Sequence, residues 1–294
     1  MSGSDTIKQT FSEFSNDDCM TLAAALAYYT VFSLPSILLI VVYIAGSVFG
    51  QAAVRGEIQS KVSGAVGPQV ASQLQTMIGS AAHSTAGIVA TVLAIAGLVF
   101  SATGTFTQLQ TSLNRTWDVE PDSSGVRSFV WKRVISFLMI VGIAIVVLIG
   151  LGASTGVTAL ANTIGLPIPT PLAYAAEIVI SWIIFTLLFG AIFKVLPDAT
   201  LAWRDVKVGA AVTAVLFVIG KFLIGFYLAH SSTASAYGAA GSLALLLLWT
   251  YYSALILLLG AEFTQVWARD HHRAIEPERG AHRVVRQLQP APSR

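Results

Sequence analysis

Three ionisable side chains fall inside long apolar runs of this chain: Glu177, Lys221 and Glu262. Charged groups at membrane depth are costly, so they usually face a bundle interior or a wet cavity and mark proton or substrate pathways. The same groups can also serve packing alone, as a buried ion pair that fixes helix register or as a lysine that extends toward the membrane surface. The residues leave both interpretations open.

Depth along the helices decides which of these groups can meet. From a rise of about 1.5 Å per residue, Glu177 lies about 7 Å and Lys221 about 12 Å below the outer ends of their helices. An ion pair between them is predicted, on the condition that the two helices are neighbours. Glu262 lies near the inner boundary, too far from Lys221 for contact. We expect its partner to be a basic residue or a tyrosine at that level: Lys194, Arg204 or Tyr28.

Two further residues could line a path through the membrane. Tyr251 is eleven residues before Glu262, which places both on one helical face and predicts a polar seam. Pro35 interrupts the first apolar run, and proline removes a backbone hydrogen bond and kinks a helix. This proline predicts either a packing kink or a broken helix that lines a substrate path.

The composition places the chain among proteins with several membrane spans. Hydrophobic residues make up 55% of the 294 residues and charged residues 11%, and the mean hydropathy is +0.72. Soluble domains carry about 25% charged residues. The sequence has no basic stripe interleaved with aromatic residues, so we expect no nucleic-acid partner. The single cysteine, Cys19, excludes an internal disulfide framework. The polar, acidic N-terminal segment is not a signal peptide, so the first span is expected to direct insertion.

We predict an all-α fold with six transmembrane helices, because six apolar runs are long enough to cross a bilayer core of about 30 Å. They are Ala23–Phe49, Ala86–Phe106, Val134–Gly152, Leu172–Phe193, Val208–Ala229 and Gly241–Ala268. Residues 50–85 predict short amphipathic helices on the membrane surface between spans 1 and 2. The domain division is a cytoplasmic N-terminal segment (1–20), a six-helix membrane domain (21–268) and a basic cytoplasmic tail (269–294), which we expect to be disordered.

The basic residues indicate the orientation of these spans. With both termini in the cytoplasm, all but three of the 17 basic residues fall in the inner segments; the exceptions are Arg55, Lys61 and Lys221. This asymmetry is what the positive-inside rule expects of six spans with both ends inside. We therefore predict a multi-pass membrane protein with both termini in the cytoplasm.

Enzyme chemistry finds little support in the residues. The five histidines do not combine with carboxylates in a metal-ligand pattern, and neither a Gly-rich phosphate loop nor a nucleophile elbow is present. We expect no catalytic residues, no metal and no cofactor. The Gly46/Gly50 and Gly152/Gly156 pairs predict close helix packing and leave the oligomeric state open.

Several longer motifs make the chain resemble the YihY/virulence factor BrkB family of bacterial inner-membrane proteins, once labelled ribonuclease BN. The resemblance covers roughly residues 20–268. It lies in AALAYYTVFSLPS (24–36), LNRTWDV (113–119), PDATLAWRDVKVGA (197–210), Gly220-Lys221, YGAAGSL (237–243) and LLLLWTYYSALILLLGAEF (245–263). It implies a six-span, all-helical fold and an envelope or transport role. Lys221 and Glu262 match motif positions, whereas Glu177 does not.

The leading functional hypothesis is a transporter or lipid-handling envelope protein. Membrane lipids and a small-molecule or lipid substrate would be its partners. The charges buried at membrane depth, without a catalytic constellation, motivate this hypothesis. The alternative is a membrane scaffold for envelope partners, in which the polar residues only hold the bundle together. A ribonuclease ranks last, because phosphodiester hydrolysis needs clustered metal ligands or a paired acid and base.

Overall fold

The computed structural model describes most of the helical part of the chain. The described residues are 3–49, 88–122, 134–135, 138–139, 141–142, 145, 170–230, 241–273, 275–278 and 280–284. Side chains are described over most of these ranges, with gaps that include Pro35 and Glu177. The predicted surface helices at 50–85 lie outside the described residues, and so does most of the predicted third span, Val134–Gly152.

Five long helices of the described residues each contain all or nearly all of one of the predicted apolar runs. They are α2 (Cys19–Phe49), α5 (Ile88–Thr116), α7 (Thr170–Val195), α8 (Trp203–His230) and α10 (Gly241–Asp270). By length and composition, three described stretches suffice to cross a membrane: Ile178–Val195, Trp203–Ile224 and Leu243–Asp270. The helical, membrane-type fold that the sequence predicts is therefore confirmed for the second half of the chain.

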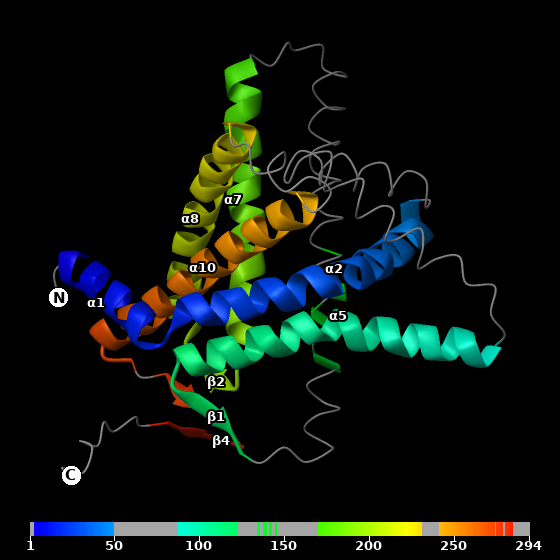
Figure 1. Cartoon of the computed structure of the whole chain (residues 1–294). Helices are drawn as coiled ribbons and strands as arrows, with labels where there is room; N and C mark the ends of the chain where they lie inside the picture. Colours follow the sequence, from blue (N-terminus) through cyan, green and yellow to red (C-terminus); the bar gives the residue numbers. More distant parts are fainter. Residues whose placement is uncertain are drawn as a thin grey trace, which may run out of the picture.

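The long helices form two pairs with α10 between them (Figure 1). Helices α2 and α5 run side by side, as do α7 and α8, and the two pairs diverge away from the end where the short strands lie. Helix α10 packs against α2 on one side and α8 on the other, and it also contacts α5. Helix α10 is thus the element that joins the two pairs.

Small residues allow α8 and α10 to approach closely. A Cβ atom at Gly209 would overlap the side chain of Thr264, and a Cβ atom at Gly260 would overlap that of Thr213. Each threonine hydroxyl donates to the carbonyl of the glycine on its own helix, Thr213 to Gly209 and Thr264 to Gly260, both at 2.7 Å. Two reciprocal Gly-xxx-Thr steps therefore interlock the helices, as small-xxx-small faces do in membranes.

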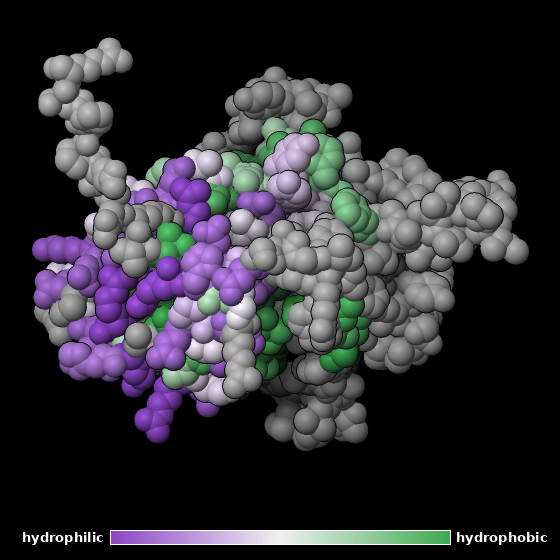
Figure 2. Space-filling view, turned by 90° about the horizontal axis from the view of Figure 1, so that it is seen from below, coloured by the Kyte–Doolittle hydropathy of each residue, from purple (hydrophilic) through white to green (hydrophobic). Residues whose placement is uncertain are grey.

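One end of the bundle carries a cap built from distant segments. Strands β1 (Val119–Pro121) and β4 (Ala281–Arg283) pair antiparallel, and so do β2 (Ala199–Thr200) and β3 (Glu276–Pro277). Helix α1 (Gly3–Asn16) packs on α10 at the same end. Hydrophilic side chains gather on this face of the molecule (Figure 2). The same end of the bundle thus holds α1, the C-terminal ends of α5 and α7, and the last described residues of the chain.

Three observations correct expectations from the sequence. First, β3 and β4 lie inside the tail, 269–294, that was expected to be disordered; backbone pairing with β2 and β1 orders a segment with few apolar residues. Second, α5 continues ten residues past Phe106, the end of the predicted apolar run. In this extension the hydroxyls of Thr107 and Thr111 bond to carbonyls one turn back, which satisfies them within the helix. Third, α2 continues through Pro35, so the broken-helix alternative is wrong.

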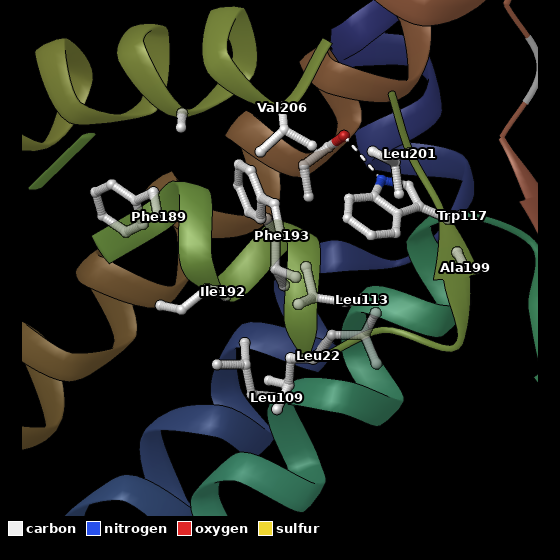
Figure 3. Close-up of a cluster of buried hydrophobic side chains, with 14 of the residues drawn as sticks. Leu22, Leu109, Leu113, Trp117, Phe189, Ile192, Phe193, Ala199, Leu201 and Val206 are labelled. Carbon is white, nitrogen blue, oxygen red and sulfur yellow. Dashed lines mark hydrogen bonds between the residues drawn. The ribbon is translucent and has the colours of Figure 1, made fainter. Parts of the chain in front are cut away.

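The buried core lies next to the cap (Figure 3). Leu22, Leu113 and Phe193 pack there with Trp117, whose ring meets that of Phe193 edge-on at 6.0 Å. The indole Nε1–H of Trp117 donates to the carbonyl of Ala261 on α10 at 3.1 Å (Figure 3). A buried Trp with a satisfied N–H therefore fixes α5 against α10.

Candidate functional site

A cavity of about 480 Å³ lies between the two diverging helix pairs. Its walls come from α2, α5, α7, α8 and α10, and six of the lining residues are Leu26, Leu109, Phe189, Phe217, Trp249 and Leu257. Twelve of the sixteen lining side chains are apolar, and the other four carry hydroxyl groups. The volume falls within the range of about 300–1,000 Å³ that is typical of small-molecule pockets.

The few hydroxyl groups along the walls do not make the cavity polar. Thr250 donates to the carbonyl of Leu246 at 2.8 Å, and Ser253 donates to that of Trp249 at 2.9 Å, both within α10. Such bonds to the preceding turn satisfy a hydroxyl inside an apolar helix. Thr105 differs, because its buried Oγ1 has no hydrogen-bond partner among the described residues. This oxygen is itself enclosed by protein atoms, so it does not add polar surface to the cavity.

Aromatic rings line the wall formed by α7, α8 and α10. Phe217 of α8 lies 4.6 Å from Phe185 and 5.6 Å from Phe189 of α7, and 6.4 Å from Trp249 of α10, measured between ring centroids. Rings at these separations attract one another beyond the area they bury. This wall is therefore a rigid, preformed surface.

The cavity is closed toward the cap. One turn beyond the lining residues Leu26 and Leu109, the side chains of Leu22 and Leu113 are buried in the core of Figure 3. Leu258 of α10 is also fully buried there. An occupant can therefore enter between the diverging helices but not through the capped end.

Glu262 lies beyond this core, on the turn of α10 that faces α1 and α2. It is fully buried, and the thiol of Cys19 donates to its Oε1 at 3.4 Å. Its Oε2 has no hydrogen-bond partner among the described residues. Asp17, itself 5% exposed, and Glu13 are its acidic neighbours.

The partners expected for Glu262 from the sequence are therefore wrong. Lys194 instead donates to the carbonyl of Leu201 at 2.6 Å, and Arg204 is exposed. Tyr28 is 57% exposed and packs against Tyr29 and Phe32. Asp17 and Cys19 were missed because more than 240 residues separate them from Glu262. Their depth in the membrane could have indicated them, because they directly precede the inner end of the first span and Glu262 lies near the inner end of the sixth.

The remaining predicted path residues are spread over the bundle. Lys221 is half-buried on α8 and makes no hydrogen bond or ion pair with any described side chain. Glu177 belongs to α7, which packs directly on α8, so the condition for their ion pair is met. The side chain of Glu177 lies outside the described residues, and the pair stays a prediction. Tyr251 is half-buried and packs against the core.

Histidines and acidic residues do not gather into a metal centre in the part of the chain that the structure describes. His282 bonds through Nδ1 to Asp122 at 2.9 Å, and His271 bonds through Nδ1 to the carbonyl of Trp267 at 2.9 Å. Both lie at the exposed capped end.

Comparison with known proteins agrees with this architecture. The chain matches the family described as Virulence factor BrkB over residues 10–284. A UPF0761 membrane protein of Ralstonia nicotianae is 28% identical over 253 residues, which cover 83% of this chain and 54% of that protein. A UPF0761 membrane protein of Mannheimia succiniciproducens is 26% identical over 265 residues, 87% of either chain.

A more distant relative has a different name. YfkH of Bacillus subtilis, described as ribonuclease-like, is 24% identical over 271 residues, 87% of this chain and 92% of YfkH. The chain spans about half the length of the Ralstonia relative and 61% of one from Alcanivorax borkumensis. No solved structure matches the chain. Because the family match extends over nearly the whole sequence, the chain belongs to the Virulence factor BrkB family of bacterial membrane proteins.

Proposed function

We propose that this protein is an integral inner-membrane protein with six spans and both termini in the cytoplasm, and that it handles lipid or transports lipid-like solutes. The observation that carries the proposal is the apolar cavity of about 480 Å³ among α2, α5, α7, α8 and α10. Its occupant would be an acyl chain, which enters between the diverging helix pairs.

The position of the cavity supports an acyl chain as the occupant. Its α10 wall, from Leu246 to Leu257, and its α7 wall, from Phe185 to Ile192, both lie within stretches apolar enough to span a membrane. At that depth the surrounding medium is hydrocarbon, and water is a poor occupant of an apolar cavity.

The arrangement of the described ends supports the proposed topology. The segments after α5, between α7 and α8, and after α10 meet in one cap together with α1. Six spans with an inner N-terminus would bring these same segments to the inner face. The cap also holds most of the arginines and lysines that the positive-inside rule assigns to the cytoplasm.

The ionisable residues keep their place in the proposal. Lys221, with Glu177 as its partner, would provide the polar point along the α7–α8 side, where a lipid phosphate or another anionic group could bind. Tyr251 lies on the same helix as the lining residues Thr250 and Ser253. These roles are proposals about the path of the substrate.

The test uses the full-length protein in nanodiscs that contain a phospholipid with a photoactivatable group in one acyl chain. Cross-links mapped by mass spectrometry are expected on the cavity wall, around Thr250 to Leu257. Ala254→Trp should fill the cavity and remove these cross-links, and the smaller change Ser253→Phe should reduce them. Leu187→Trp is the matched control, because Leu187 is 62% exposed on the outside of α7.

Two results would contradict the proposal. Cross-links confined to outward positions such as Leu187, and unchanged in Ala254→Trp, would show that no acyl chain enters the cavity. The second is a transport assay in which liposomes containing the protein move lipids and small solutes no faster than empty liposomes. This result would contradict a transport function and favour a scaffold.

A further inference from the structure

A second buried site lies at the capped end, separate from the cavity and behind the core that closes it. Here α1 covers the inner end of α10, and the chain turns sharply between α1 and α2. Asp18 adopts a left-handed conformation in this turn, with φ of 54°, and its side chain accepts a hydrogen bond from Thr21 at 2.9 Å. The turn therefore exposes Asp18 and points Asp17 inward.

Two carboxyl groups meet beneath this turn. Glu262 is 0% exposed and Asp17 5% exposed, and the two side chains interact. Glu262 Oε1 accepts a weak hydrogen bond from Cys19, whose Sγ also lies 4.0 Å from Thr116 Oγ1. Glu262 Oε2 is buried and has no partner among the described residues. A buried acceptor without a donor is unfavourable, and it is more so when it carries a charge.

Two arginines near this site bind other carboxylates, and Arg115, in the last turn of α5, is exposed. Arg269 of α10 bonds to Glu13 of α1 at 2.8 Å, with both side chains partly exposed. Arg273 binds Asp205 of α8 through Nε and Nη2 at 2.6–3.0 Å. Gln265 of α10 donates to the carboxylate of Asp118, which lies just past the end of α5, at 3.5 Å. None of these described contacts brings a cation to Glu262.

Glu262 is fully buried with one oxygen unpartnered among the described residues and a second carboxyl group beside it. A carboxyl group in such a water-poor site favours the protonated form. The orphaned Oε2 of Glu262 is the atom where such a proton would sit, because a protonated carboxyl group can donate as well as accept. We propose that Asp17 and Glu262 together bind one proton, and that this proton holds α1 against the inner end of α10.

This site has a mechanical consequence. Loss of the shared proton would place two negative charges beneath α1, with Glu13 as a third carboxylate close by. Helix α1 is held to the rest mainly by its packing on α10 and by the exposed Glu13–Arg269 pair, which contributes little. Deprotonation should therefore release α1 from the bundle. The inference does not depend on lipid binding.

The test is infrared spectroscopy of the purified full-length protein in nanodiscs, titrated with pH. The C=O band of a protonated carboxyl group should be present at neutral pH and disappear on alkalinisation. Glu262→Gln should abolish this band. Asp17→Asn should move its disappearance to lower pH by about one pH unit, because the neighbouring charge is gone. Asp18→Asn is the matched control, since Asp18 is exposed and Asn retains the cap, and it should leave the band unchanged.

A second readout follows α1 itself. A spin label is attached at Ile7→Cys, an exposed position on α1; native Cys19 is buried and stays unlabelled. The label should become mobile over the pH range in which the band disappears, because α1 is then released. Absence of a band that responds to Glu262→Gln would overturn the proposal. The pH at which the band disappears should be the same in sodium and in choline salts of equal ionic strength. A shift of that pH between the two salts would also overturn the proposal, because the site would then bind an alkali cation rather than a proton.

Discussion

Asn114 and Asp198 bind each other in both directions. The Nδ2 of Asn114 donates to Oδ2 of Asp198 at 2.7 Å, and the backbone N–H of Asp198 donates to Oδ1 of Asn114 at 2.8 Å. Gln110 adds a bond to the same carboxylate at 3.2 Å, and the N–H of Glu278 donates to the Asp198 carbonyl at 3.0 Å. One joint thus links the end of α5, the end of α7 and the C-terminal tail.

Removal of this joint should destabilise the capped end. Asn114→Ala removes the acceptor of the Asp198 N–H and one donor to the Asp198 carboxylate, and the loss of such bonds at a half-buried site costs about 1–3 kcal/mol. We expect a lower midpoint in thermal unfolding of the detergent-purified protein. Thr111→Ala, one turn earlier on the exposed face of α5, should change the midpoint little. Equal effects of the two variants would contradict the role of the joint.

The sequence predicts the long helices well, because an apolar run of about twenty residues leaves the backbone few alternatives in a bilayer. It does not predict the cap. Strands of two or three residues, such as β2 and β3, carry no detectable period, and their partners lie far away in the sequence. The motif residues Asn114 and Trp117 were recognised as a pattern, but only the structure shows that they bind Asp198 and Ala261.

The candidate sites show the same limit. The depth of Glu262 follows from its place in the sixth apolar run, whereas its contacts with Cys19 and Asp17 depend on the turn between α1 and α2. The cavity could not be predicted, because a void depends on the angle between helix pairs, which the order of apolar runs does not specify.

The interlocked glycines make a discriminating pair of variants. A Cβ atom at Gly209 would overlap Thr264, whereas one at Gly190 would lie 3.7 Å from the Cβ of Ala210, an ordinary contact. Gly209→Ala should therefore destabilise the protein by about 1–3 kcal/mol through overpacking. Gly190→Ala should be neutral or stabilising, because alanine favours a helix over glycine by up to about 1 kcal/mol. Thermal unfolding compares the two, and a tolerated Gly209→Ala would disprove the close approach of α8 and α10.

Two arginines near the end of α10 should differ in their effect on stability. Arg273 holds Asp205, whose side chain is 2% exposed, whereas Arg269 holds Glu13 with half of its own side chain in solvent. Arg273→Ala leaves a buried carboxylate unpaired and should cost about 2 kcal/mol, a value reduced for the solvent around Arg273. Arg269→Ala should cost less than about 1 kcal/mol. Denaturation of both variants under the same conditions compares their free energies of unfolding. A larger loss of stability in Arg269→Ala than in Arg273→Ala would contradict this prediction.

The orientation in the membrane can be tested with single cysteines, because native Cys19 is fully buried and gives no background. Ile7→Cys on α1 and His282→Cys on β4 lie at the same capped end, so a membrane-impermeant maleimide should treat them alike. On intact cells neither should react, whereas Ser232→Cys, in the loop predicted outside, should. After permeabilisation both should react. Labelling of only one of the two would contradict the cap, and labelling of both on intact cells would reverse the orientation inferred from the basic residues.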